Sequence, residues 1–453
     1  MSQINDPLKV AVVGAGIGQS IHHSLSAKLQ NSLDPGGLSA AIALRNVGHA
    51  VTVYEKYPSA FTSTTSPLSN AIALGANINR IIDKWGFDFP KAKPGVNKQE
   101  RVFHGETLQQ LHHIDFKYNR EEFGYDWLLM RRQALHEGLL SIAMATPSML
   151  LPIDIRMDQE VIALSPEKGA LTLREGREVV SDLVVVADGV HSKLIDTITN
   201  NTTPPLRAGR TAYRFKISRE QIMADPDLRA LYEKEDEGMS YFQIPEKRIY
   251  FLVIQADGGE SWYGLLIHPA IATNIDAIQK YNVEGSKTEL QKLAENLHPT
   301  VRKLCNLAAT PLLWTICCRE PLTSCVNGRA VAIGDACHPH LPSHGQGAAA
   351  AAEDAASLGV FLSGIAQPFL PTKVPAALQQ WESFRLPRAI AVQLITIRFP
   401  TPIEELESKI RALGYDDRLP ANVNSHERAI TQWLFEYNVV AEATKCCEKI
   451  RHS

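Results

Sequence analysis

The sequence predicts an α/β fold built on a parallel sheet, because three buried strands each run into a turn that contains glycine. These strands span Leu8 to Val13, Ser181 to Ala187 and Arg329 to Ile333, and they lead into GAGIG, DGV and GDAC. Continuous runs of β-branched residues are typical of strands that are covered on both faces. Alternating strands between Tyr213 and His268 predict a second, mixed sheet, and helices dominate the chain after Gly347.

Size and charge limit the possible functions. The chain has 453 residues, 45% of them hydrophobic, which is enough for two or three domains. Its net charge is −3, from 46 basic and 49 acidic residues, so no nucleic-acid partner is expected. The polar N-terminus does not resemble a signal peptide, and the uncharged run from Ala389 to Ile397 is too short to span a membrane. The sequence therefore predicts no membrane attachment.

The seven cysteines indicate a reducing compartment. Their number is odd, two pairs are direct neighbours, and no Cys-x-x-Cys spacing occurs. Neither a disulfide framework nor a zinc site is expected, and a cytoplasmic location fits best. The histidine-rich segment HPHLPSH, from His338 to His344, lacks an acid or cysteine that would complete a ligand set, so we expect no metal there.

The first glycine turn has the composition of a phosphate-binding site. Gly14, Gly16 and Gly18 follow the first strand, and Glu55 follows the second, Ala50 to Tyr54. Bare backbone N–H groups at a helix N-terminus can approach a pyrophosphate, and an acid after the second strand can accept hydrogen bonds from a ribose. The pattern predicts a dinucleotide site.

One segment interrupts this motif, because Gln19 stands where the third glycine belongs. In one interpretation the helix begins at Ser20. In the other, Gln19 to Gly36 is an insertion and Gly37 is the third glycine. Gly14 and Glu55 are 41 positions apart as written and 23 without the 18-residue segment, and the motif expects about 20. We favour the second interpretation.

The origin of the segment stays open between a translated intron and a genuine surface excursion. Its removal restores an uninterrupted motif in frame. A transcript read across codons 18 to 37 distinguishes the two, because a spliced message would lack the segment. A genuine excursion would lie where the pyrophosphate is expected to bind.

The later glycine turns carry a resemblance to a known family. The strings ADGVHS, from Ala187, and GDACHPHLPSHGQGAAAAAEDAASL, from Gly334, follow GAGIG and Glu55 in the order found in the group A flavoprotein monooxygenases, such as para-hydroxybenzoate and salicylate hydroxylases. The similarity extends over almost the whole chain. It implies a Rossmann-like FAD-binding domain with an inserted substrate domain and C-terminal helices. FAD is then the cofactor, and NAD(P)H and O2 are co-substrates.

The resemblance also implies domain limits and cofactor contacts. Residues 1–90, 120–200 and 318–370 would form the FAD domain, 91–119 and 201–317 the substrate sheet, and 371–453 the helical segment. Asp335 would bind the ribityl hydroxyls, and the N-terminus of the following helix would face the reduced ring. The remaining expected FAD contacts are Ala71, Arg132, Asp188, Gly345, Gly347 and Ala348.

Arg214 is the candidate residue for substrate binding. It lies in Gly209 to Phe215, which resembles the family's tyrosine–arginine strand, and Tyr250 is the candidate for an assisting tyrosine. Family chemistry uses a flavin C4a-hydroperoxide that is attacked by a phenolate, and an arginine can hold the phenolate oxygen. We expect a phenolic aromatic substrate, as in fungal secondary metabolism or aromatic breakdown. The expected oligomeric state is a monomer or homodimer.

Two alternatives to phenol hydroxylation remain open. The first is a relative that epoxidises an alkene. The second is a non-catalytic flavin-fold protein, or the inert product of a faulty gene model, because the phosphate turn is interrupted. Bound flavin, visible as a yellow protein, would distinguish the enzymes from the inert alternative.

Overall fold

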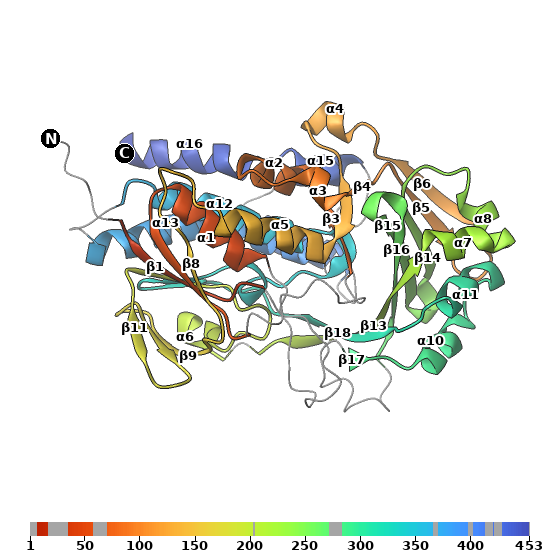
Figure 1. The fold of residues 1–453 in the computed structure, drawn as a ribbon, viewed down its shortest axis with the longest axis horizontal. Coiled ribbons are helices and arrows are strands. Elements are labelled where there is room, and N and C mark those ends of the chain that lie inside the picture. The colour runs from red at the N-terminus through yellow and green to blue at the C-terminus, as the bar shows by residue number, and fades with distance from the viewer. Residues whose placement is uncertain are drawn as a thin grey trace.

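The computed structural model describes residues 7–16, 35–57, 70–202, 204–270, 283–365, 370–396, 402–412, 420 and 428–452. Two large sheets stand side by side in it, with helices packed against each of them (Figure 1). The predicted α/β fold with a second, mixed sheet is confirmed. In the described ranges, no helix has both the length and the apolar character needed to cross a lipid bilayer.

The first sheet has six strands in the order β19-β20-β12-β1-β2-β8. Their bounds are β1 Lys9–Val13, β2 Ala50–Tyr54, β8 Asp154–Arg156, β12 Leu183–Val186, β19 Val326–Asn327 and β20 Ala330–Ala332. All pairs are parallel except the short edge pair of β19 with β20. The four residues of β12 (LVVV) are buried, as expected for a strand that is covered on both faces. The carboxyl ends of β1, β12 and β20 therefore meet at one edge, where the three glycine turns lie.

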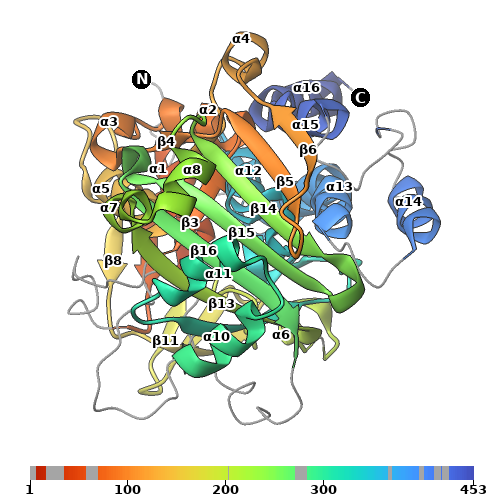
Figure 2. The ribbon, with the colours of Figure 1, turned by 90° about the vertical axis from the view of Figure 1, so that its right-hand side faces the viewer.

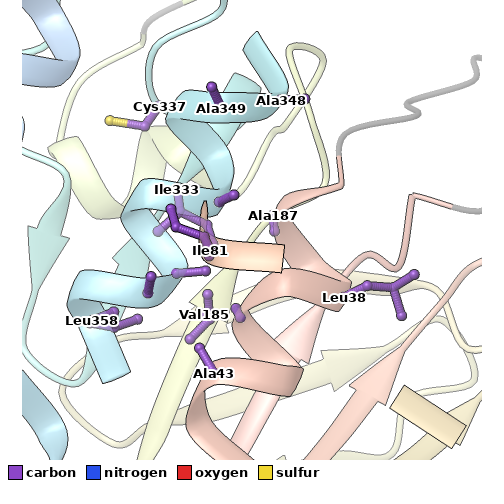
Figure 3. Packing of buried hydrophobic residues seen from close by; sticks show 14 of the residues in the cluster. Leu38, Ala43, Ile81, Val185, Ala187, Ile333, Cys337, Ala348, Ala349 and Leu358 are labelled. Atoms are coloured by element: carbon purple, nitrogen blue, oxygen red, sulfur yellow. The ribbon is translucent and has the colours of Figure 1, made fainter. Parts of the chain in front are cut away.

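Helices α1 (Gly36–Asn46), α5 (Arg132–Met144) and α12 (Gly347–Leu362) pack beside this sheet (Figure 1). Alanine allows close approach between α1 and α12, which contact each other extensively. Figure 3 shows the packing, with Ala43 of α1, Val185 of β12 and Leu358 of α12 gathered in one buried cluster. Helix α12 begins at Gly347, where the sequence predicted the helical part of the chain, and α1 begins at Gly36.

The second sheet has eight strands in the order β17-β18-β13-β16-β15-β14-β5-β6. Their bounds are β5 Gln99–His104, β6 Gln110–Asp115, β13 Leu206–Ser218, β14 Gly238–Ile244, β15 Ile249–Ala256, β16 Ser261–Pro269, β17 Val283–Glu284 and β18 Leu312–Cys318. All neighbours are antiparallel except β14 and β5. One face packs on α7 (Arg219–Ala224), α8 (Pro226–Tyr232), α10 (Lys287–Ala294) and α11 (Pro299–Asn306), which lie in front of the sheet in Figure 2.

Smaller elements complete the described fold. Two three-stranded sheets contain β3 Ala71–Leu74, β7 Leu128–Arg131 and β4 Gly95–Val96, and β9 Val161–Ser165, β10 Ala170–Leu173 and β11 Glu178–Val180. The shorter helices are α2 Ala76–Lys84, α3 Phe89–Ala92, α4 Asn119–Phe123 and α6 Ile195–Thr199, with 3₁₀ turns η2 Pro245–Lys247, η3 Asp257–Gly259, η5 Gly334–Ala336 and η6 Pro342–His344. The C-terminal helices are α13 Leu370–Thr396, α14 Ile403–Arg411, α15 Arg428–Phe435 and α16 Val439–His452.

Helix α13 corrects one expectation from the sequence. The sequence from Ala376 to Phe399 is typical of a long helix, and its proline predicts an interruption at Pro387. In the structure the helix continues through Pro387 to Thr396. Proline removes one backbone hydrogen bond, and neighbouring packing can hold such a helix together. Trp381 and Arg385, six and two positions before the proline, are fully buried. Tertiary contacts therefore outweigh the local preference to end the helix.

Candidate active site

Close backbone packing defines the first glycine turn. Gly14 has φ +92°, and a Cβ there would lie 2.6 Å from the carbonyl oxygen of Ala187. A Cβ on Gly37 would lie 1.8 Å from the carbonyl oxygen of Gly14, so α1 begins directly against the turn. Gly37 thus stands where the third glycine of the motif is expected. Gly16 also has a left-handed φ of +69°. Gly18 and most of the interrupting segment lie outside the described residues.

Glu55 holds the turn in place from the end of β2. Its buried carboxylate accepts hydrogen bonds from the backbone N–H of Ala15 at 2.8 Å and of Tyr57 at 3.1 Å. A carboxylate has further lone pairs, so these bonds leave acceptor capacity for ribose hydroxyls. The structure therefore adds an anchoring contact to the ribose-binding contact that the sequence predicted.

Asp188 lies in the second turn, directly after β12 and beside Gly14. Its Oδ1 atom is covered and has no hydrogen-bond partner among the described residues. Burial raises the pKa of Asp188 to about 6, although the Ser192 side chain and the charges of Lys56 and Arg319 act in the opposite direction. A covered carboxylate oxygen without a donor is costly, so it indicates a ligand hydroxyl or water at this position.

Asp335 and Arg132 approach the same end of a cavity. Arg132 opens α5, and its backbone N–H donates to the carbonyl of Asn70 at 2.7 Å, next to Ala71. Burial raises the pKa of Asp335, while the charges of Arg132 and His338 act in the opposite direction. Ala71, Arg132 and Asp335, three of the residues that the sequence predicts as FAD contacts, all line the cavity.

The N-terminus of α12 points at this cavity without a side-chain cap. Gly345 has φ +63° and closes the preceding 3₁₀ turn, and a Cβ there would lie 3.1 Å from Cβ of Ala73. Gly347 has open space around it, with its nearest neighbour 3.9 Å from an added Cβ. The first turn of this 16-residue helix contains no acid. Gly347 and Ala348 thus present backbone N–H groups and the positive end of the dipole to a ligand.

A buried ion network, which the sequence did not predict, holds the third glycine turn at Gly334. Asp354 of α12 accepts from Gly334 N–H at 2.9 Å, from His338 at 2.8 Å and from Arg385 of α13 at 2.6 Å. The carboxylate raises the pKa of His338 to about 9, and its cationic partners lower that of Asp354 to about 2. The Glu-Asp-Ala string was visible in the sequence, but its partner Arg385 lies 31 positions away.

The histidines of HPHLPSH do not form a metal-ligand set. His338 is bound to Asp354, and burial beside the charged His338 lowers the pKa of His340. Among the described residues, the group with metal-ligand spacing is His104, Glu106 and Glu246, at the end of β5 and in η2. Lys247 already forms an ion pair with Glu106 there.

One continuous cavity of about 680 Å³ extends from the ends of the second and third glycine turns, at His191 and Asp335, to the eight-stranded sheet. Successive side chains of β13 point to opposite faces of the sheet. Tyr213 therefore packs toward the helices behind the sheet, while Arg210 and Arg214 point into the cavity. The other residues that line the sheet side include Glu100, Met239, Tyr241, Gln243, Tyr250, Leu252, Ile254, Tyr263, Leu265, Ile267, Trp314 and Ile316. The structure thus brings both predicted substrate residues, Arg214 and Tyr250, to the cavity.

The two predicted substrate residues have different neighbours. The Cζ atom of Arg214 lies 3.3 Å from the ring centroid of Trp314, a cation–π stack. Tyr250 instead lies under Arg210, whose Cζ is 5.5 Å from its ring, and stacks on Tyr241 at 6.2 Å. Arg210, Tyr241 and Trp314 were missed from the sequence. The period of two along Arg210, Ala212 and Arg214 was the available signal for Arg210.

Comparison with known proteins defines the class. Residues 34–393 match the FAD binding domain family, so the chain belongs to it. Hispidin-3-hydroxylase of Neonothopanus nambi is 24% identical over 435 residues, 92% of this chain and 96% of that protein. The FAD-dependent monooxygenase atnJ of an Arthrinium species is 28% identical over 405 residues, 86% of this chain and 84% of that protein.

Solved structures show the same fold. The complex of CtdE with FAD and its substrate superposes with a TM-score of 0.75 at 21% identity, covering 98% of this chain and 99% of that one. The substrate complex of salicylate hydroxylase superposes with a TM-score of 0.71 at 18% identity, covering 97% and 98%. Together with the family match, these similarities place the chain among the FAD-dependent monooxygenases.

The residues present fit FAD. The Gly14–Gly37 contact leaves bare backbone where a pyrophosphate is expected, and Asp188 offers a covered oxygen without a donor. The uncapped α12 N-terminus can hold negative charge on a flavin ring. The family match begins at residue 34, within the last residues of the interrupting segment, and so leaves β1 and the first glycines outside it.

Proposed function

We propose that this flavoprotein hydroxylates a phenolic aromatic substrate and uses NAD(P)H as electron donor and O2 as oxidant. The observation that carries the proposal is one continuous cavity with cofactor-facing groups at one side and Arg214 at the other. Two similar proteins are hydroxylases by name, hispidin-3-hydroxylase and salicylate hydroxylase, which supports the same reaction here. When bound, FAD supplies the activation of O2.

Arg214 binds and orients the substrate oxygen in this proposal. Its guanidinium carbon lies 3.3 Å from the ring centroid of Trp314, and this contact restricts the positions that the guanidinium can take. A charge-assisted hydrogen bond favours the phenolate over the phenol and thereby makes the ring carbon more nucleophilic. Tyr250 lines the same cavity and is the proposed hydrogen-bonding partner for a second substrate oxygen. The apolar lining, including Ile316 and Leu341, excludes water from the reacting atoms.

The cofactor-facing residues have distinct proposed roles. Asp335 accepts hydrogen bonds from the ribityl hydroxyls, and Arg132 neutralises nearby negative charge. The N–H groups of Gly347 and Ala348 stabilise the anionic edge of the reduced ring. The pyrophosphate lies at the Gly14–Gly37 turn, and Glu55 binds the ribose. Each role follows from a group that lines the cavity or the turn.

We also infer that the enzyme works in the cytoplasm, where NAD(P)H is maintained and thiols stay reduced. All seven cysteines are free, three of them buried. The free thiols support this location without depending on the proposed substrate.

The test compares phenols with their methyl ethers. Purified protein is loaded with FAD, and NADH and NADPH oxidation is followed with a phenol panel and with the matched anisoles. We expect stimulation by at least one phenol and none by its ether, because only the phenol can ionise against Arg214. Equal stimulation by both, or by neither, would overturn phenol hydroxylation while leaving the family membership intact.

A further inference from the structure

The cavity face of the eight-stranded sheet carries a second guanidinium that the proposed chemistry does not use. Arg210 and Arg214 are four residues apart on β13, and the pairing with β16 runs without a shift from Arg210 opposite Pro269 to Ser218 opposite Ser261. A regular strand returns to the same face every second residue. Both arginines therefore project from one face, and both line the cavity.

The two guanidinium groups diverge from their common strand. Arg214 stacks on Trp314, which belongs to β18 on one side of β13. Arg210 stacks over Tyr250, which belongs to β15, beyond β16 on the other side. Strands β18 and β15 are three places apart in the sheet, and neighbouring strands lie about 4.8 Å apart. The two cations are therefore separated by roughly 10 to 15 Å across the cavity floor.

Of the two arginines, Arg214 lies nearer the loop that leads from η5 to α12. Leu341, in the loop that leads from η5 to α12, packs with Ala212 and Ile316. Trp314 borders the same small cluster, so the loop that contains Leu341 covers the sheet next to β18. Arg210 points away from this end toward the Tyr241–Tyr250 pair. A ligand group at Arg210 is thus distant from the reacting ring.

The surroundings of Arg210 suit an anionic group with an aromatic neighbour. Burial lowers the pKa of Arg210, and the nearby charge of Arg248 acts in the same direction. A desolvated cation beside another cation gains from an anion brought by a ligand. The stacked rings of Tyr241 and Tyr250 offer an aromatic wall next to it.

We propose that Arg210 is a second anion-binding residue, and that the substrate is an elongated phenolic acid of at least two rings. Its phenol oxygen lies at Arg214, and a carboxylate or an equally acidic oxygen lies at Arg210. The inference rests on the proposed function for the identity of the reacting end. A cavity of about 680 Å³ is large enough for such a molecule beside a flavin ring.

The experiment uses two probes that differ only in the distal acid, 4′-hydroxybiphenyl-4-carboxylate and 4-hydroxybiphenyl. Their dissociation constants are measured by calorimetry on the FAD-loaded enzyme, its Arg210→Gln variant and an Arg210→Lys variant. We expect the wild type to prefer the carboxylate by about 10- to 100-fold, the worth of a charged hydrogen bond. Arg210→Gln abolishes this preference, and Arg210→Lys restores part of it.

Lys216→Gln is the matched control. Lys216 is an exposed cation on the same strand, 5.9 Å from the ring of Tyr263, so its loss should leave the preference unchanged. If Arg210→Gln weakens the binding of both probes equally, or of neither, Arg210 has only a structural role in the sheet and the proposal is overturned. Because binding needs no turnover, a retained preference without phenol-stimulated NAD(P)H oxidation would refute the proposed function and leave the anion site standing.

Discussion

Replacing Gly37 by alanine tests the close contact on which the dinucleotide turn depends. The added Cβ would lie 1.8 Å from the carbonyl oxygen of Gly14, whereas real Cβ contacts stay above 3.0 Å. The N-terminus of α1 must therefore retreat by 3.0 − 1.8 = 1.2 Å or more. Both partners are backbone atoms in a buried core, so the movement has to displace α1 against α12.

Overpacking of this kind costs about 1 to 3 kcal/mol. The same displacement removes N–H groups from the pyrophosphate, and each 1.4 kcal/mol lost there is about tenfold in affinity. We expect Gly37→Ala to lower the Tm of the apoprotein by a few degrees and to raise the Kd for FAD by about tenfold or more. Differential scanning fluorimetry and flavin fluorescence quenching measure the two effects.

Gly347→Ala is the stability control, because an added Cβ there meets nothing closer than 3.9 Å. It should leave the Tm of the apoprotein close to that of the wild type. A Gly37→Ala protein with wild-type Tm and wild-type FAD affinity would refute the assignment of Gly37 as the third glycine of the motif.

Further predictions concern the substrate residues, the buried ion network and the interrupting segment. Arg214→Gln should lower kcat/KM for a phenol by about 10- to 100-fold, since it removes a charged hydrogen bond of about 1.5 to 3 kcal/mol, while Tyr250→Phe should have a smaller effect; steady-state kinetics with both variants decide this. His338 has a folded pKa of about 9 against 6.5 unfolded, so its stabilisation, roughly 3 kcal/mol, is complete below pH 6.5 and disappears as pH rises through 9. The partner Asp354, at about 2 against 3.8, loses its stabilisation as pH falls from 3.8 through 2. The Tm difference between wild type and His338→Asn should therefore shrink on both sides, and a difference independent of pH would contradict the ion pair. Deleting residues 19–36 should preserve the fold and strengthen FAD binding, and weaker binding in the shortened protein would contradict the insertion hypothesis.

The glycine turns were predictable because their chemistry is local. A turn that must approach other backbone closely requires glycine, and the count of positions from Gly14 to Glu55 pointed to Gly37 as the third glycine. In the structure α1 begins at Gly36, and a Cβ added to Gly37 would lie 1.8 Å from the Gly14 carbonyl oxygen. The apolar strands behind the turns were equally visible, because burial on both faces leaves a continuous hydrophobic run.

The parts that the sequence left open depend on contacts between distant elements. Asp354 accepts a hydrogen bond from Arg385 of α13. The sequence predicted that this helix would be interrupted at Pro387, so the contact could not be foreseen. Trp314 meets Arg214 only because β18 pairs with β13, about a hundred positions earlier in the chain. Tyr250 was predicted from the resemblance to the family, whereas its neighbour Arg210 follows from the order of the strands.

The incorporation of molecular oxygen into a phenol tests the central claim most directly. The FAD-loaded enzyme is supplied with NAD(P)H, a phenolic acid and ¹⁸O2, and the product is analysed by mass spectrometry. The account predicts a product that gains one ¹⁸O atom on the ring, together with loss of this product in the Arg214→Gln variant. NAD(P)H oxidation that yields only hydrogen peroxide with every phenol, or a product whose new oxygen comes from water, would contradict it.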